Sequence, residues 1–231
     1  MVSQNILNFY SALKANNNKV WFDENRKWYE SVKKEYQSLT GKILDELKSV
    51  YNSLEMLQVK DCTFRINRDI RFSPDKSPYK TNLGINFAPY GKKMMLAGYY
   101  IHIESGQSFA GGGLYMPMSP ELKKVRKEIH YCYDEFLSII QNPVFNGTFG
   151  SLDRDPGTVL SRPPKEFTSD DPAIEWLKLK SFTAVKPIED KLLTSSDFVP
   201  HIIKIMKAIK PLIGFLNNAL LSDENGILKA P

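Results

Sequence analysis

The chain has 231 residues, of which 42% are hydrophobic and 25% charged, and its formal net charge is +5. This length and composition are typical of a folded globular protein and argue against a disordered or fibrous chain. The charged residues are spread along the chain, so the positive charge alone does not identify a nucleic-acid-binding surface.

The N-terminal segment lacks the basic residues, apolar run and cleavage site of a secretory signal. The most apolar late stretch, residues 211–221, is too short to span a bilayer. We therefore expect a cytoplasmic protein without a membrane partner. The two cysteines, Cys62 and Cys132, have no metal-ligand spacing, so we expect reduced thiols rather than a disulfide or a zinc site.

Three helices are predicted in the first quarter of the chain. Ser3 is the expected cap of a short helix whose apolar stripe begins at Ile6, and an asparagine-rich turn follows at residues 16–18. The second helix is predicted over residues 20–38. The third is predicted over residues 41–54, with Thr40 as its cap.

The middle of the chain predicts strands over residues 64–72, 83–89, 94–104 and 108–116. Turn signals at residues 90–92 and 105–106 favour an antiparallel meander. In the first of these segments Phe64, Ile66, Ile70 and Phe72 alternate as an apolar face that Arg68 interrupts. The run of three glycines at residues 111–113 indicates a bulge or a close approach of backbones, and it lacks the lysine of a phosphate loop.

The last third predicts a helix over residues 119–140 and a loop-rich segment over residues 142–167. A short helix follows from Asp171 to about Lys180, then a strand over residues 181–186, and a long helix over residues 197–221 that contains Pro211. The predicted fold is a single α+β domain over residues 1–231. Its antiparallel sheet, open or closed into a barrel, is packed by the N-terminal and C-terminal helices.

The segment over residues 64–80 combines cations, aspartates and aromatic residues within a short stretch. Its function has two interpretations. In the first, its cations converge on a phosphate or carboxylate beside the ring of Tyr79, and the candidate ligands are Arg65, Arg71, Lys76, Tyr79 and Lys80. In the second, the segment is a braced turn, with Arg68, Asp69 and Asp75 as structural ion pairs. In either case we expect Arg68 to be buried against a carboxylate from the N-terminal helices or from Glu104.

Other candidates lie on neighbouring elements. Asn25 and Arg26 interrupt an apolar helix stripe, so they either reach the same pocket or Arg26 pairs with Asp69 or Glu30. His102 and Glu104 share one face of a strand and could form an acid–base pair, and Glu104 with Asp69 could form a carboxylate pair. The three histidines lie on different predicted elements, so no metal site is expected, and no cofactor motif is present.

Five blocks of the sequence together resemble the pattern of a bacterial and fungal family known as domain of unknown function family 2461. The blocks are NNNKVWFDENRKWYE, FRINRDIRFSPDKSPYKTN, GYYIHIE, SFAGGGLYMP and LKLKSF. The resemblance runs nearly end to end and implies no activity. It does imply that two groups of residues belong to the family pattern. The first group is Trp21, Phe22, Asn25, Arg26 and Tyr29. The second group is Arg68, Asp69, Arg71, Phe72, Asp75, Lys76, Pro78, Tyr79 and Lys80.

The leading functional hypothesis is a small-molecule binding protein or enzyme with a basic pocket for a phosphorylated or carboxylated ligand. The alternative is a non-enzymatic interaction or structural module in which the RDxRFSxDKSPYK motif braces the fold. A second alternative is nucleic-acid binding with Tyr79, Tyr90 and Tyr100 as stacking surfaces. It is disfavoured because the basic residues do not cluster beyond this motif. The sequence makes no prediction of oligomeric state.

Overall fold

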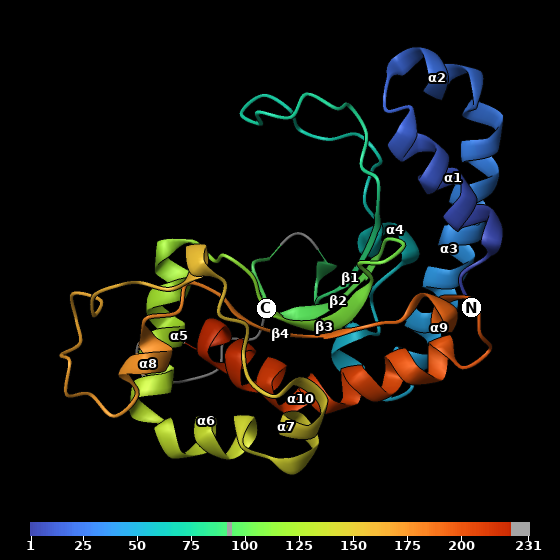
Figure 1. Cartoon of the computed structure of the whole chain (residues 1–231). Helices are drawn as coiled ribbons and strands as arrows, with labels where there is room; N and C mark the ends of the chain where they lie inside the picture. The colour runs from blue at the N-terminus through green and yellow to red at the C-terminus, as the bar shows by residue number, and fades with distance from the viewer. Residues whose placement is uncertain (92–93, 223–231) are drawn as a thin grey trace. The chain divides into compact units, whose positions relative to one another are not determined.

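The computed structural model describes residues 1–91 and 94–222 and contains one antiparallel sheet with strands in the order β1–β2–β3–β4 (Figure 1). The strands are β1 (Leu83–Phe87), β2 (Gly98–Ile103), β3 (Phe109–Leu114) and β4 (Phe182–Pro187). The predicted α+β class is confirmed. Of the two predicted forms of the sheet, open or closed into a barrel, the structure has the open one. Tyr90 and Gly91 of the first predicted turn have positive φ angles of 60° and 66°, and Lys92 lies outside the described residues.

The chain divides into two compact units. Unit 1 consists of residues 1–91, 100–110 and 187–204, and unit 2 consists of the remaining described residues. The prediction of one domain over residues 1–231 stays a prediction.

Unit 1 is built mainly from N-terminal helices. Its elements are α1 (Gln4–Ala15), α2 (Lys19–Glu24), α3 (Arg26–Lys48), the 3-10 turn η1 (Asn52–Leu54), α4 (Val59–Cys62), β1, α9 (Asp190–Leu193) and the first part of α10 (Phe198–Leu221). The Ser3 hydroxyl accepts a hydrogen bond from the Ile6 backbone N–H, which confirms the predicted cap of α1.

The boundaries predicted for the second and third helices are wrong. The helix breaks at Asn25, whose side-chain amide donates to the Trp21 carbonyl at 2.9 Å and ends α2. Helix α3 then continues through Thr40 to Lys48. Thr40 is buried and its hydroxyl donates to the Tyr36 carbonyl at 2.9 Å, so it bonds within the helix instead of capping a new one.

The strand predicted over residues 64–72 is also wrong. Residues 66–80, which we call the basic arm, form two irregular limbs joined by backbone bonds from Arg68 N–H to the Pro78 carbonyl and from Lys80 N–H to the Ile66 carbonyl, at 2.9 and 2.8 Å. The arm projects from the sheet region of unit 1 (Figure 1). Phe72 is 93% exposed. The arm therefore bonds to itself rather than to the sheet, and the apolar face predicted from the alternation is absent.

Unit 2 contains α5 (Ser119–Tyr131), α6 (Tyr133–Ile140), α7 (Pro143–Phe149), the 3-10 turn η3 (Pro156–Thr158), α8 (Ile174–Leu177), β4 and the last part of α10. Phe136 packs against Trp176 and Phe215 with ring centroids 5.6 Å away in each case. The single helix predicted over residues 119–140 breaks at Cys132, which has φ −111° and ψ 40°. Helix α7 was not predicted, although Asn142 caps it by accepting from the Val144 N–H.

None of the helices within the described residues combines the length and the hydropathy that a transmembrane span requires.

The glycines of β3 allow it to lie unusually close to its neighbours. A Cβ atom on Gly111 would lie 2.0 Å from the Ala184 carbonyl oxygen of β4, and one on Gly112 would lie 2.3 Å from the Gly98 oxygen of β2. Gly113 has a φ of 122° and would clash with the Phe182 carbonyl in the same way. The glycine run is therefore a close approach of backbones, one of the two predicted forms.

We expect Gly111→Ala to lower the free energy of unfolding by at least about 2 kcal/mol, because the clash is with backbone and cannot be relieved by a side-chain rotation. Denaturant titration measures this change. The matched control is Gly147→Ala in α7, where a Cβ meets nothing within 4 Å, and where alanine should be neutral or stabilising by about 0.5–1 kcal/mol. Equal unfolding midpoints for the two variants would contradict this account of the glycine run.

Candidate functional site

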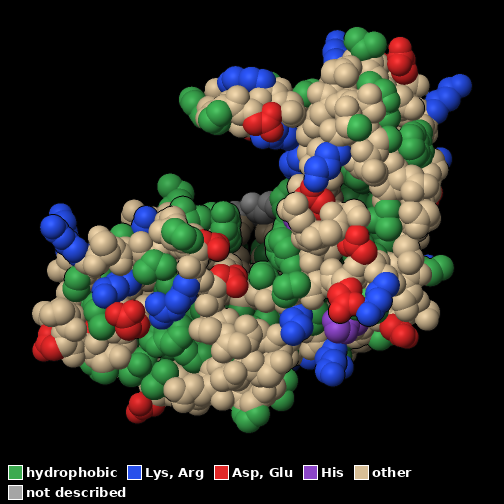
Figure 2. Space-filling view, in the orientation of Figure 1, with side chains coloured by type: hydrophobic (Ala, Val, Ile, Leu, Met, Phe, Trp, Pro, Cys, Tyr) green, Lys and Arg blue, Asp and Glu red, His purple; other side chains and the backbone are tan. Residues whose placement is uncertain are grey.

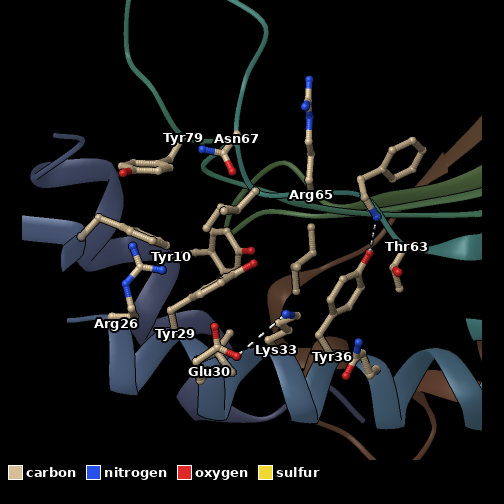
Figure 3. Close-up of a pocket in the computed structure, with 16 residues that line it drawn as sticks. Tyr10, Arg26, Tyr29, Glu30, Lys33, Tyr36, Thr63, Arg65, Asn67 and Tyr79 are labelled. Atoms are coloured by element: carbon tan, nitrogen blue, oxygen red, sulfur yellow. Dashed lines mark hydrogen bonds and ion pairs between the residues drawn. The ribbon is translucent and has the colours of Figure 1, made fainter. Parts of the chain in front are cut away.

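Unit 1 contains a cavity of about 460 Å³, and helices α2 and α3 form one of its sides (Figure 3). Residues 63–67 and Tyr79, at the base of the basic arm, form the other side. The lining residues are Tyr10, Phe22, Arg26, Tyr29, Glu30, Val32, Lys33, Tyr36, Gln37, Thr63, Phe64, Arg65, Ile66, Asn67, Tyr79 and Leu83.

Tyr79 is fixed by a side chain from the turn before α2. The Asn17 side-chain Nδ2 donates to the Tyr79 carbonyl at 2.9 Å, and the Asn17 side-chain Oδ1 accepts from the Tyr79 N–H at 3.1 Å. The Tyr79 ring is stacked on Phe22 of α2, with centroids 4.1 Å apart and an interplanar angle of 21°. Asn17 thus gives Tyr79 the two bonds that a neighbouring strand would give, and the stack orients its ring.

Tyr36 connects α3 to the strand side of unit 1. Its hydroxyl donates to the Gly84 carbonyl of β1 at 2.6 Å and accepts from the Phe64 N–H at 3.4 Å (Figure 3). Burial raises the pKa of Tyr36, of Tyr10 and of Tyr29 above the usual tyrosine value. At neutral pH these phenols are therefore protonated, and they can donate hydrogen bonds but cannot act as bases.

Three cations and one carboxylate line the cavity. Arg26 donates to the Asp23 carboxylate at 2.8 Å and lies over the Phe22 ring at 5.4 Å. This hydrogen bond to Asp23 raises the pKa of Arg26. Lys33 lies 3.8 Å from Glu30, and Arg65 takes part in no salt bridge among the described residues. The lining therefore has an excess of positive charge, and Arg65 is the lining cation for which the described residues supply no salt bridge.

The cations of the basic arm do not converge. Arg71 forms two hydrogen bonds to Asp69, at 2.9 and 2.6 Å, and its side chain is 76% exposed. Lys76 donates to the Ile70 carbonyl and Lys80 to the Arg65 carbonyl, each at 3.0 Å. In Figure 2 the arm carries basic, acidic and hydrophobic side chains on its surface.

Arg68 braces the two limbs of the arm. Its guanidinium donates to Asp75, to the Ser77 carbonyl at 3.2 Å and to the Ser73 hydroxyl at 3.3 Å. The Ser77 backbone N–H, followed by the Ser77 hydroxyl and Arg68, lowers the pKa of Asp75 to about 2. Arg68 is 26% exposed, and its carboxylate comes from the arm. The predicted partners on the N-terminal helices or at Glu104 are thus wrong.

Three of the sequence candidates, Arg26, Arg65 and Tyr79, line the same cavity. Asn25 precedes Arg26 but bonds to the Trp21 carbonyl, and Arg26 pairs with Asp23 rather than with Asp69 or Glu30. The sequence analysis did not identify Tyr10, Tyr29 and Lys33 as site residues. For Tyr29 two signals were available, because it belongs to the family pattern and shares the predicted apolar helix stripe with Phe22.

His102 and Glu104 form a separate pair, with 3.2 Å between His102 Nε2 and Glu104 Oε2. Lys14 donates to the other Glu104 oxygen at 2.9 Å, and the His102 ring stacks on Phe109 with centroids 4.8 Å apart. Burial opposes ionisation of Glu104, but the bonds from Lys14 and His102 hold its pKa below the usual value. Asp69 bonds to Arg71, so the predicted pairing of Glu104 with Asp69 does not occur.

Within residues 1–91 and 94–222 no group of three or more histidine, cysteine or acidic side chains has the geometry of a metal site. Cys62 is buried and Cys132 is half-buried, and neither forms a disulfide bond within the part of the chain that the structure describes.

Removing the Arg68 side chain should loosen the arm without unfolding unit 1. The pair is partly exposed, with Asp75 60% exposed, so we expect Arg68→Ala to lower the free energy of unfolding by less than about 1 kcal/mol. Hydrogen exchange of the Lys80 amide, which bonds across the arm, should accelerate. In the control Arg71→Ala that exchange should not change. A loss of several kcal/mol, or unchanged Lys80 exchange in Arg68→Ala, would contradict the bracing role.

Comparison with curated proteins and with solved structures gave no match to this chain. A family model described as conserved hypothetical protein (DUF2461) matches residues 5–215. That match covers all of the site residues described above and confirms the resemblance seen in the sequence blocks. The chain belongs to the DUF2461 family.

Proposed function

We propose that the chain binds a small carboxylated or phosphorylated molecule in the tyrosine-lined cavity of unit 1. The observation that carries this proposal is that Arg26, Arg65 and Tyr79, selected from the sequence as ligand-binding candidates, line one cavity. Its volume of about 460 Å³ lies within the range of about 300–1,000 Å³ that is typical of small-molecule sites.

Arg65 is the residue best suited to hold the anion. It is exposed, borders the cavity and forms no salt bridge among the described residues, so an incoming anion does not have to displace a carboxylate from it. Its side chain extends away from the other labelled lining residues in Figure 3, so it has to turn toward the cavity to meet the anion. A guanidinium can bind a carboxylate or a phosphate through two parallel hydrogen bonds. Arg26 and Lys33 add positive charge, although Asp23 and Glu30 offset part of it.

Two tyrosine hydroxyl groups add hydrogen-bond donors to the cavity. Tyr10 and Tyr29 line the cavity, and their hydroxyl groups point toward one another in Figure 3. Because burial raises the pKa of both, they stay protonated at neutral pH and can donate to oxygen atoms of the ligand. The proposal assigns binding and no reaction.

The structural alternative applies to a different part of the chain. Arg68, Asp69, Asp75 and Lys76 bond to groups within the basic arm, which supports the view that the RDxRFSxDKSPYK motif braces the arm. The cations of this motif do not line the cavity, so we separate the two roles. In this proposal the cavity binds the ligand, and the motif keeps the two limbs of the basic arm together.

A thermal-shift screen of inorganic phosphate and of carboxylated and phosphorylated metabolites tests the proposal. A ligand at a hundred times its dissociation constant should stabilise the fold by about 2.7 kcal/mol. Arg65→Gln should weaken binding at least about tenfold, or about 1.4 kcal/mol, because it removes the cation that faces the ligand.

The control is Lys76→Gln, which removes a cation of the arm that bonds to the Ile70 carbonyl outside the cavity lining. Its affinity should equal that of the parent protein. A panel in which no anion shifts the melting curve, or in which Lys76→Gln loses as much affinity as Arg65→Gln, would overturn the proposal.

A further inference from the structure

The walls of the cavity are unusually rich in aromatic rings. Of the 16 residues that line it, the aromatic ones are Tyr10, Phe22, Tyr29, Tyr36, Phe64 and Tyr79. They come from α1, α2, α3 and the base of the arm. An anion that needed only charge and hydrogen bonds would not require rings on several sides of its site.

Three of these rings, Phe22, Tyr29 and Tyr79, form a connected surface. Phe22 is in ring contact with Tyr29, at 5.1 Å and 52°, as well as stacked on Tyr79. Tilted and offset arrangements of this kind allow a further ring to add either by its face or by its edge. The remaining apolar lining residues, Val32, Ile66 and Leu83, are aliphatic and buried, so they can form a non-polar floor beneath such a ring.

The cations lie beside these rings. Arg26 is over the Phe22 ring at 5.4 Å, and Arg65 is adjacent in sequence to Phe64 and lines the same cavity. A ligand whose ring contacts the aromatic wall would therefore place an attached acid group near a guanidinium.

We infer that the ligand of this cavity is an aryl anion, a molecule in which a planar aromatic ring carries a phosphate or carboxylate group. The inference rests on the proposed binding function and names the class of ligand. The ring packs against the aromatic wall, and the Tyr10 and Tyr29 hydroxyls can donate to a polar substituent of the ring. The acid group meets the Arg65 guanidinium when that exposed side chain turns from the position in Figure 3 toward the cavity.

Two matched pairs of probes test this inference by isothermal titration calorimetry. They are phenyl phosphate with cyclohexyl phosphate, and benzoate with cyclohexanecarboxylate. The members of a pair have the same charge and nearly the same size, and they differ in whether the ring is planar and aromatic. We expect the aromatic member of at least one pair to bind at least tenfold more tightly than its saturated partner.

Two variants test whether the preference comes from the cavity. Phe64→Leu changes a partly exposed lining ring, and Tyr79→Leu changes the stacked ring while leaving the backbone atoms that bond to Asn17. Each should reduce the aromatic preference severalfold, whereas Tyr79→Phe should keep it. Circular dichroism melting checks that each variant is folded. If Tyr79→Leu does not fold, Phe64→Leu alone tests the aromatic preference.

The outcomes separate the two proposals. Equal affinity for aromatic and saturated members, with both weakened by Arg65→Gln, would overturn the aryl inference and leave anion binding in the cavity intact. An aromatic preference that Phe64→Leu and Tyr79→Leu leave unchanged would place the ring elsewhere and overturn the inference. Binding of none of the four probes would overturn the aryl inference, and failure of the wider metabolite panel would overturn the proposed function as well.

Discussion

The attachment of Tyr79 to Asn17 is the constraint on which the cavity depends. The two residues are 62 positions apart, and the Asn17 side chain bonds to both the N–H and the carbonyl of Tyr79. A backbone segment outside the sheet has no strand to satisfy these groups, so a side-chain amide with one donor and one acceptor replaces it. The base of the arm is thereby held against α2, and the space between them becomes a cavity with fixed walls.

The break between α2 and α3 has a matching consequence. Asn25 ends α2, so Phe22 and Tyr29 lie on two separate helices and still bring their rings within 5.1 Å of each other. In an uninterrupted helix these two residues, seven positions apart, would lie on one face but about 10 Å apart along the axis. The bond from Tyr36 to the Gly84 carbonyl then fixes α3 to β1 on the far side of the same cavity. Polar contacts thus set the positions of the rings, and the rings give the cavity its apolar character.

The sequence predicted the elements whose pattern is local. The Ser3 cap, the strands at residues 83–87 and 182–187, and the alternation that buries Tyr99, Ile101 and Ile103 follow from period and cap signals, and the structure confirms them. The arm was misread because an alternating pattern does not reveal whether a segment pairs with the sheet or with itself. The cavity was only partly predicted. Arg65 and Tyr79 belong to the polar segment over residues 64–80 and Arg26 interrupts an apolar helix stripe, whereas Tyr10 and Lys33 become site residues through contacts between distant segments.

Amide hydrogen exchange at Tyr79 tests the central claim most directly. If Asn17 holds the base of the arm, the Tyr79 amide is protected in the parent protein, and Asn17→Ala accelerates its exchange far more than that of the β1 amides. Binding of the anionic ligand should weaken in the same variant, because the wall formed by Tyr79 is released. A Tyr79 amide that already exchanges at the rate of an unfolded chain in the parent protein, or one that is equally protected in Asn17→Ala, would contradict the account.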